Sequence, residues 1–428
     1  MKWRVILTGV SLMAVATSTA AVAEMTFIHA GHLMADPATG EVKQEQTITI
    51  EDGRVIAIRD GYVGEGNVVD LTGQFVLPGL IDAHVHLLHE NGPGDKLARV
   101  TKTPADWAID GVPFARKTLL AGFTTVANVG DENTSIYALR DGIMEGKIIG
   151  PRVIAAGNVI SPHGGEGDVY GYRTDVTKAI ARPNLCSGAD DCRRVVRQHI
   201  QFGADMVKIV ATGAVLSDAD AGVDQQFTAD ELKAIVETAH AFGRIVTAHA
   251  HGTAGINAFL EAGGNSIEHG TYLDDSSIKL FREKGAYLVP TLLAGATVTK
   301  WANMPDTWLS PATAKKALEV GPKMVGATRR AHEGGVKIAF GTDSSVSPHG
   351  ENAREFALLV EAGLTPLEAI QAATVNAANH LRIAAEAGRI APGMPADIVA
   401  VKENPLKDVK SLERVIFVMK AGAVYREP

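Results

Sequence analysis

Two histidines separated by one residue, His84 and His86, end a short apolar run that begins at Pro78. In an extended strand, side chains two positions apart leave from the same face, so both imidazoles would point into one cavity. Imidazoles placed in this way can hold a metal ion. Such a pair also arises by chance or as polar groups at a core edge, so the interpretation depends on ligands elsewhere in the chain.

Further residues with metal-binding chemistry stand at the ends of other short apolar runs. Lys208 lies in one run, His249 and His251 end another, His269 ends a third, and Asp343 follows a fourth. If these runs are parallel strands of one fold, their carboxyl ends meet, and the polar side chains converge on one mouth.

Along the chain, strand-like runs alternate with helical stretches, which is typical of parallel β-α units. Such units would place the polar side chains at one mouth. One helix begins at Thr228 as N-cap, with Glu231 completing a capping box. We therefore predict an α/β fold with a (β/α)₈ TIM-like barrel. Its strands are expected at 75–87, 124–129, 152–156, 206–211, 244–250, 266–269, 286–290 and 337–343.

Both chain ends contain short β-like runs separated by Gly and Asp turns, as at 47–58 and 396–424. This pattern indicates a small antiparallel β unit. We expect one β-sandwich domain built from residues 24–77 and 389–428, and the barrel between them at 78–388.

Taken in order, these motifs resemble the metal-dependent amidohydrolase superfamily. Within it the chain is similar to the prolidase-like and Xaa-dipeptidase branch, which includes ochratoxin-hydrolysing amidohydrolases. The likeness covers nearly the whole mature chain. The motifs that carry it are Gly79-Leu-Ile-Asp-Ala-His84-Val-His86, Gly203-Ala-Asp-Met-Val-Lys208, Thr247-Ala-His249, Ile267-Glu-His269-Gly270, Gly341-Thr-Asp343 and Gly388-Arg-Ile-Ala-Pro-Gly393-Met-Pro-Ala-Asp397.

The resemblance implies a centre with two divalent metal ions. His84 and His86 would hold one ion, His249 and His269 the other, and Asp343 would complete the shell of the first. Imidazole and carboxylate ligands suit Zn²⁺ best, with Mn²⁺ or Co²⁺ as alternatives.

Lys208 is the unusual member of this set, because an ammonium beside two cations would be repelled. The resemblance implies that its amine has reacted with CO₂ to form a carbamate, which would bridge both ions. The simpler alternative is a lysine in a salt bridge on a strand.

Catalysis by such a centre needs a proton carrier and a donor to the developing oxyanion. Asp343 would serve as general base and then as general acid. His163, after the third strand, and His251 are the candidates for oxyanion stabilisation and substrate binding. The alternatives are an ordinary loop histidine for His163 and a strand already broken by Gly252 for His251.

We therefore expect hydrolysis of the amide bond to a C-terminal amino acid, as in a dipeptidase or carboxypeptidase-like enzyme acting on N-acyl amino acids. The resemblance extends this to ochratoxin A, which would yield ochratoxin α and phenylalanine. Apolar residues near the mouth would hold an aromatic side chain or serve only as packing. They are Val215, Leu216, Leu292 and Leu293.

Two other functions remain open from the sequence. Hydrolysis of a cyclic amide, as in imidazolonepropionase-like members, would use the same fold. An inactive barrel serving as a binding module belongs to a different class, although all six ligand positions are filled.

Composition narrows the class of partner. Charged residues make up 21% of the chain, its formal net charge is -8, and it has no basic cluster, which argues against nucleic-acid binding. A small-molecule amide or peptide is the expected partner, and the related enzymes suggest a homo-oligomer.

The first residues predict export. Lys2 and Arg4 precede an apolar segment, and small residues then lead to a cleavage pattern at Ala23, before Glu24. We expect a signal peptide at 1–23 and a secreted or periplasmic protein without a membrane anchor; an uncleaved anchor is the alternative.

The two cysteines, Cys186 and Cys192, lie close together in the sequence. In an exported protein such a pair favours a local disulfide over a metal site, with two free thiols as the alternative.

Overall fold

The computed structural model describes residues 25–181, 183–217 and 222–428. The expected signal peptide at 1–23 lies outside these residues, so it stays a prediction. Across the described ranges, no helix has the length and apolar character needed to cross a membrane.

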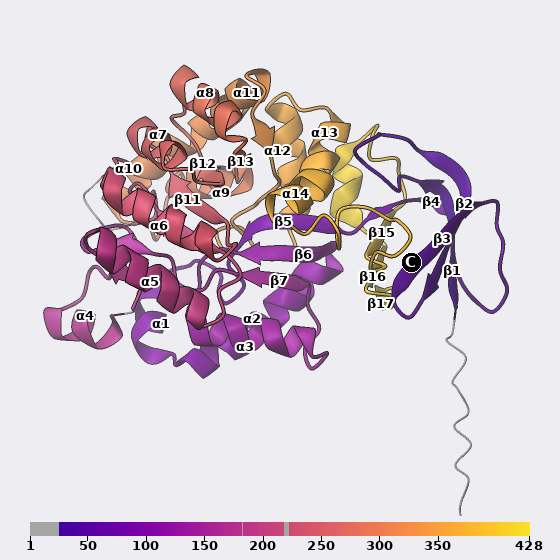
Figure 1. Ribbon diagram of the computed structural model, residues 1–428, viewed down its shortest axis with the longest axis horizontal. Helices are drawn as coiled ribbons and strands as arrows, with labels where there is room; N and C mark the ends of the chain where they lie inside the picture. The colour runs from indigo at the N-terminus through magenta and orange to yellow at the C-terminus, as the bar shows by residue number, and fades with distance from the viewer. Residues whose placement is uncertain (1–24, 182, 218–221) are drawn as a thin grey trace, which may run out of the picture.

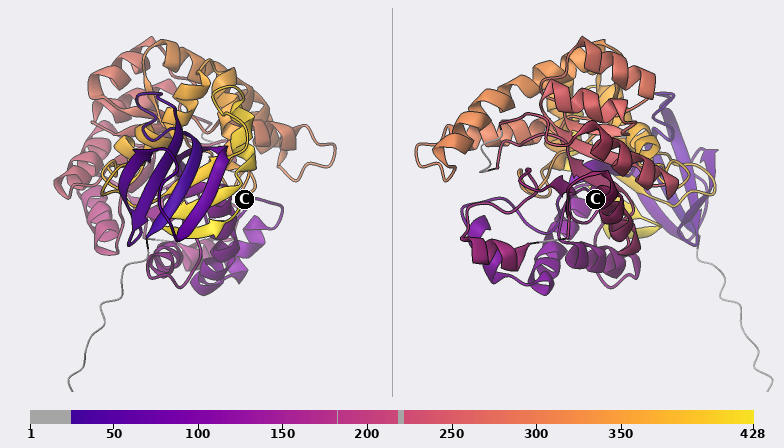
Figure 2. Two further views of the ribbon diagram at one scale, coloured as in Figure 1. Left: turned by 90° about the vertical axis from the view of Figure 1, so that its right-hand side faces the viewer. Right: turned by 60° about the vertical axis from the view of Figure 1, so that its left-hand side comes forward.

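Both chain ends contribute to one seven-stranded sheet. Its strands are β1 (Thr26–Leu33), β2 (Lys43–Glu51), β3 (Arg54–Asp60), β4 (Asn67–Pro78), β15 (Ile398–Val401), β16 (Phe417–Lys420) and β17 (Ala423–Arg426). The strand order is β17-β16-β15-β4-β1-β2-β3, and Figure 2 (left) shows the indigo and yellow strands side by side. The expected β unit built from both chain ends is confirmed. It is one continuous sheet rather than the two separate sheets of the expected β-sandwich, because β15 pairs directly with β4.

Eight parallel strands form the second part of the molecule. They are β5 (Leu80–Val85), β6 (Phe123–Asn128), β7 (Arg152–Ala155), β10 (Val207–Val210), β11 (Val246–Ala250), β12 (Ser266–His269), β13 (Tyr287–Val289) and β14 (Lys337–Ile338). They make two sheets, β5-β6-β7 and β10-β11-β12-β13-β14.

Backbone hydrogen bonds connect these two sheets at both edges. The Ala83 N–H donates to the Phe340 carbonyl beyond β14, and the Asp205 N–H donates to the Ala155 carbonyl at the end of β7, each over 2.8 Å. All neighbouring strands within the sheets are parallel. The expected α/β fold class of (β/α)₈ type is confirmed.

The expected first barrel strand, 75–87, is in fact divided between the two parts. Phe75–Pro78 pairs with β15, and β5 begins only at Leu80. Pro78 has no N–H for a further ladder bond, and a Cβ on Gly79 would lie 2.1 Å from the Thr124 hydroxyl oxygen. These two residues carry the chain from one sheet to the next.

Helices follow most of the barrel strands and cover their outer side (Figure 1). The predicted capping box of α6 is present, because the Glu231 carboxylate accepts hydrogen bonds from the N–H and hydroxyl of Thr228. The helices are α1 (Asp95–Thr101), α2 (Pro104–Leu120), α3 (Asn133–Met144), α4 (Thr174–Ile180), α5 (Ala189–Gln201), α6 (Ala229–Ala241), α7 (Thr253–Glu261), α8 (Asp275–Lys284), α9 (Leu292–Ala302), α10 (Pro311–Val320), α11 (Met324–Glu333), α12 (Glu355–Glu361), α13 (Pro366–Gln371) and α14 (Ala377–His380), with shorter turns at Gly321–Lys323, Asn352–Arg354, Ala372–Asn376 and Val409–Arg414.

Strand β15 joins the two parts through its alternating side chains. Ile398 and Ala400 pack into the core of the seven-stranded sheet, whereas Val399 and Val401 pack into a core that also holds residues of β5, β6 and α2. Because successive side chains of a strand face opposite sides, one strand serves both cores.

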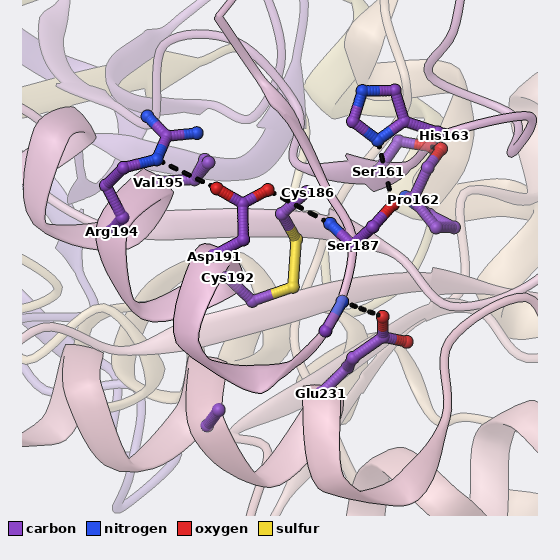
Figure 3. The surroundings of a disulfide bond; sticks show 12 residues. Ser161, Pro162, His163, Cys186, Ser187, Asp191, Cys192, Arg194, Val195 and Glu231 are labelled. Carbon is purple, nitrogen blue, oxygen red and sulfur yellow. Dashed lines mark hydrogen bonds and ion pairs between the residues drawn. A yellow bond between two sulfur atoms is a disulfide. The ribbon is translucent and has the colours of Figure 1, made fainter.

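A disulfide bond joins Cys186 and Cys192, so the prediction of a local disulfide is confirmed (Figure 3). Cys186 ends β9 (Leu185–Cys186), which pairs with β8 (Ser161–Pro162), and Cys192 lies in α5. Both cysteines are fully buried, and the bond anchors this short pair of strands to the helix.

Candidate metal centre

His84 and His86 leave the carboxyl end of β5 and meet Asp343, as the spacing predicted. The Nε2 atoms of His84 and His86 lie 3.4 and 3.2 Å from Asp343 Oδ1. Asp343 has a left-handed backbone, with φ of 57°, and its N–H donates to the His84 carbonyl over 2.8 Å. This sharp bend after β14 directs the carboxylate onto both imidazoles.

Three further histidines gather at the ends of β11 and β12. The ring centroids of His249 lie 4.8 Å from His251 and 4.5 Å from His269. One nitrogen from each of the three rings lies within 4.8 Å of the others, and His84, His269 and Asp343 form a second group of this kind. His269 therefore belongs to both groups, which brings β5, β12 and the β14 loop together.

The Nδ1 atoms of His84 and His86, on the outer side of each ring, have defined hydrogen-bond partners. His84 Nδ1 lies 2.6 Å from Glu268 Oε2, and His86 Nδ1 lies 2.5 Å from the Gly130 carbonyl oxygen. Both partners accept hydrogen bonds, so Nδ1 carries the proton and Nε2 presents its lone pair to the centre.

The same arrangement occurs at His269. Its Nδ1 lies 2.6 Å from the Thr291 hydroxyl oxygen, and that hydroxyl donates its own hydrogen to the Pro290 carbonyl. Thr291 must therefore accept from His269, which again leaves Nε2 free to bind. His251 Nδ1 lies 2.8 Å from the Thr271 hydroxyl oxygen.

Burial keeps the β11 and β12 histidines neutral. It lowers the pKa of His249 and His269 well below the usual value, with neighbouring imidazoles adding to the effect, and lowers the pKa of His251 to about 4. His249 Nε2 is buried without a hydrogen-bond partner among the described residues. Neutral imidazole is the metal-binding form, and an orphaned nitrogen at this place suits a missing ligand.

Lys208 reaches the same centre from β10 and is 3% exposed. Burial lowers the pKa of its amine, although Glu268 and Asp343 act in the opposite direction. Burial therefore favours the neutral amine, the form that reacts with CO₂. This environment is compatible with the expected carbamate.

All six predicted ligands line one cavity of about 360 Å³. Its other walls are of mixed character, and Asp131, Glu166, Asp168 and Arg99 are among the polar lining residues. The donor set of five imidazole or carboxylate groups and one amine fits two divalent ions. The six residues are His84, His86, Lys208, His249, His269 and Asp343.

His163 does not join this set. Its side chain is exposed, and Nδ1 lies 2.8 Å from the Ser187 hydroxyl beside the disulfide (Figure 3). A turn closed by the Gly165 N–H and the Pro162 carbonyl directs it there, and His163 is absent from the described residues that line the cavity. The predicted contact of His163 with substrate finds no support in the structure.

A second, smaller cavity of about 160 Å³ opens beside the histidines, and His251 lines it together with His249 and His269. Its walls are mainly apolar and include the predicted Val215 and Leu216. Leu292 and Leu293 are buried at the start of α9 and do not line either cavity, so they act as packing residues. The remaining apolar lining comes from Ala214, Ala294, Val298, Val320, Met324 and Val346.

Sequence reasoning missed Glu268 and Thr291, which hold the rings of His84 and His269. A signal for Glu268 was present, because a carboxylate within a buried strand is costly unless it is paired. Thr291 had no such signal, since its contact depends on a left-handed bend at φ of 51°.

The sequence pattern of the amidohydrolase family matches residues 75–425. An ochratoxinase from Aspergillus niger is 32% identical over 95% of this chain and 88% of its own length. A Xaa-Pro dipeptidase with methionine bound in its active site superposes with a TM-score of 0.88 at 38% identity, covering 94% of this chain and all of the other. A prolidase complexed with N-methylphosphonate-L-proline gives 0.85 at 31% identity, covering 95% of this chain and all of the other.

Proposed function

Since the chain belongs to the amidohydrolase family, and so hydrolyses amide bonds, we propose that it uses two divalent metal ions to cleave the bond to a C-terminal amino acid. The observation that carries this proposal is the convergence of His84, His86, Lys208, His249, His269 and Asp343 on one cavity. In the proposed assignment His84, His86 and Asp343 hold one ion, and His249 and His269 hold the other. Lys208, once carbamylated, would also hold the ions, and Zn²⁺ is the expected metal.

The ions, when bound, supply a water of lowered pKa and polarise the scissile carbonyl. Asp343 is the proton carrier of the chain, because its carboxylate lies beside both β5 histidines at the cavity. Although burial acts to raise the pKa of Asp343, the His84 and His86 imidazoles hold it well below its usual value. The carboxylate is therefore ionised at neutral pH, and its oxygen takes a proton from the attacking water and passes it to the leaving amine.

His251 is the proposed substrate-binding residue of the chain. Its Nδ1 is engaged by Thr271 and its ring borders the apolar cavity. This leaves Nε2 for a hydrogen bond to the substrate.

The two cavities suggest the class of substrate. An apolar protein cavity of about 150 Å³ is large enough to bind benzene, so the 160 Å³ cavity has room for a phenyl-sized side chain. N-acyl or dipeptide substrates ending in phenylalanine, leucine or methionine suit it, and ochratoxin A carries such a phenylalanine amide.

The test is amino-acid release by the Zn²⁺-loaded protein from dipeptides, N-acyl amino acids, ochratoxin A and cyclic amides. Release of a C-terminal apolar residue is expected, with Asp343→Asn as the blank. Turnover of cyclic amides alone would replace the proposal by the imidazolonepropionase-like alternative. Metal binding without turnover of any compound would favour a binding module.

We also propose that the protein is exported after removal of residues 1–23 and that it forms a homo-oligomer. N-terminal sequencing of protein recovered from the cell exterior or periplasm should begin at Glu24, and light scattering should give a mass that is a multiple of one chain. A start at Met1 or a monomeric mass would contradict these two points.

A further inference from the structure

Glu268 is a carboxylate without solvent exposure, placed behind a proposed metal ligand. Its Oε2 lies 2.6 Å from His84 Nδ1, across the barrel from its own strand β12. The residue that follows Glu268 is His269, a ligand proposed for the other ion. The Glu268 carboxylate thus contacts a ligand proposed for the first ion, and Glu268 directly precedes a ligand proposed for the second.

The second oxygen of Glu268 is also fixed. Oε1 accepts a hydrogen bond from the Thr247 hydroxyl and lies 3.3 Å from the Ser266 hydroxyl oxygen. Ser266 in turn donates to Thr247 over 2.7 Å. The carboxylate is held by residues of β5, β11 and β12, so it has little freedom to turn away from His84.

A buried carboxylate of this kind is maintained only where its partners compensate for lost hydration. His84 and Thr247 provide that compensation here. In return, the carboxylate accepts the Nδ1 proton of His84, fixes the ring plane and directs the Nε2 lone pair into the cavity.

Among the described residues, the other proposed histidine ligands and His251 have no carboxylate at this position. His86 uses the Gly130 carbonyl, His269 uses the Thr291 hydroxyl, and His251 lies against the Thr271 hydroxyl. Among the described residues of the centre, His84 is the ring whose outer nitrogen faces a negative charge. This contrast sets His84 apart as the ligand with the strongest support.

We propose that Glu268 is a positioning residue that orients His84 for metal binding and sets the affinity of the centre for its ions. The inference rests on the proposed binuclear function, because it assigns His84 as a ligand. Glu268 itself touches neither substrate nor metal in this assignment.

The test compares Glu268→Gln with Glu231→Gln by Zn²⁺ titration against a chromophoric chelator. Glu231 is a matched control, since it is also a buried glutamate in a hydrogen-bonded network, at the start of α6 and beside the disulfide (Figure 3). We expect Glu268→Gln to weaken Zn²⁺ binding by about 10- to 100-fold, with Glu231→Gln unchanged. Wild-type affinity in a folded Glu268→Gln protein would overturn the inference, as would an equal loss in both variants.

Thr247→Val provides a second route if Glu268→Gln does not fold. This change keeps the carboxylate and His84 but removes the hydroxyl that fixes Oε1, so a smaller loss of Zn²⁺ affinity is expected. Unchanged affinity in Thr247→Val would then overturn the inference. Absence of Zn²⁺ binding by the wild-type protein would instead refute the proposed function, so the two failures are distinguishable.

Discussion

The two sides of the metal centre are built from the same side chain in different surroundings. On the β5 side, the Asp343 carboxylate faces both His84 and His86, and the Glu268 carboxylate lies behind His84. On the β11 and β12 side, three imidazoles lie against one another, and threonine hydroxyls are the partners of His251 and His269.

This difference determines where charge resides in the metal-free protein. Burial acts to lower the pKa of His86, but Asp343 and Asp131 outweigh it and raise the value. Burial and mutual repulsion both lower the pKa of His249 and His269. The β5 side therefore joins a histidine of raised pKa to carboxylates, whereas the imidazoles of the other side stay neutral, and His249 Nε2 has no hydrogen-bond partner among the described residues.

The largest effect that tests this comparison is expected at Asp343, which supplies the charge on the β5 side. Asp343→Asn should lower kcat/KM by about 10²- to 10⁴-fold, the usual contribution of a general acid and base. The measurement is amino-acid release at saturating Zn²⁺, with metal content determined in parallel. Activity near that of the wild type would locate the proton carrier elsewhere.

A second test compares the stability of His84→Leu and His249→Leu after metal removal. His84→Leu leaves the buried Glu268 carboxylate without the hydrogen bond from His84 Nδ1, so we expect a loss of about 3–5 kcal/mol. His249→Leu removes an unpartnered buried nitrogen, so a change within about 1 kcal/mol, or a gain, is expected. Urea unfolding with a chelator present measures the stability of both variants. Equal losses of stability would contradict the distinction between the β5 side and the β11 and β12 side.

A third test uses His380 to measure the effect of burial on a histidine outside the proposed ligand set. This side chain packs beside Tyr287, with ring centroids 5.1 Å apart, and burial lowers its pKa to about 4. Because the folded pKa lies below the unfolded value near 6.5, the stability difference is complete above pH 6.5 and is lost as the pH falls toward 4.

We expect His380 to account for up to about 3 kcal/mol of this acid sensitivity. The free energy of unfolding of His380→Leu should therefore fall less between pH 7 and pH 4 than that of the wild type. Parallel pH profiles for the two proteins would show that His380 does not titrate across this range.

The positions of ligands at strand ends could be predicted from the sequence. Parallel strands bring their carboxyl ends together, so His84, His249 and Asp343 could be grouped from their positions in short apolar runs. The contact between His84 and Glu268 could not be found in this way, because it crosses the barrel and joins residues 184 positions apart. The contact of His163 with Ser187 could not be found either, because the direction of a loop after a strand depends on its turn and on its partner strand.

The smallest expected effect concerns the disulfide, which supports the wall of the polar cavity rather than either side of the centre. Asn184 and Leu185 line that cavity directly before Cys186. Closing a loop between cysteines six residues apart contributes roughly 2 kcal/mol. Cys186→Ala with Cys192→Ala should therefore lower the free energy of unfolding by about this amount and raise KM. Zn²⁺ affinity should be unchanged, because the ligands lie on other strands; a large loss of bound Zn²⁺ would instead show that this wall and the histidine cluster are one cooperative unit.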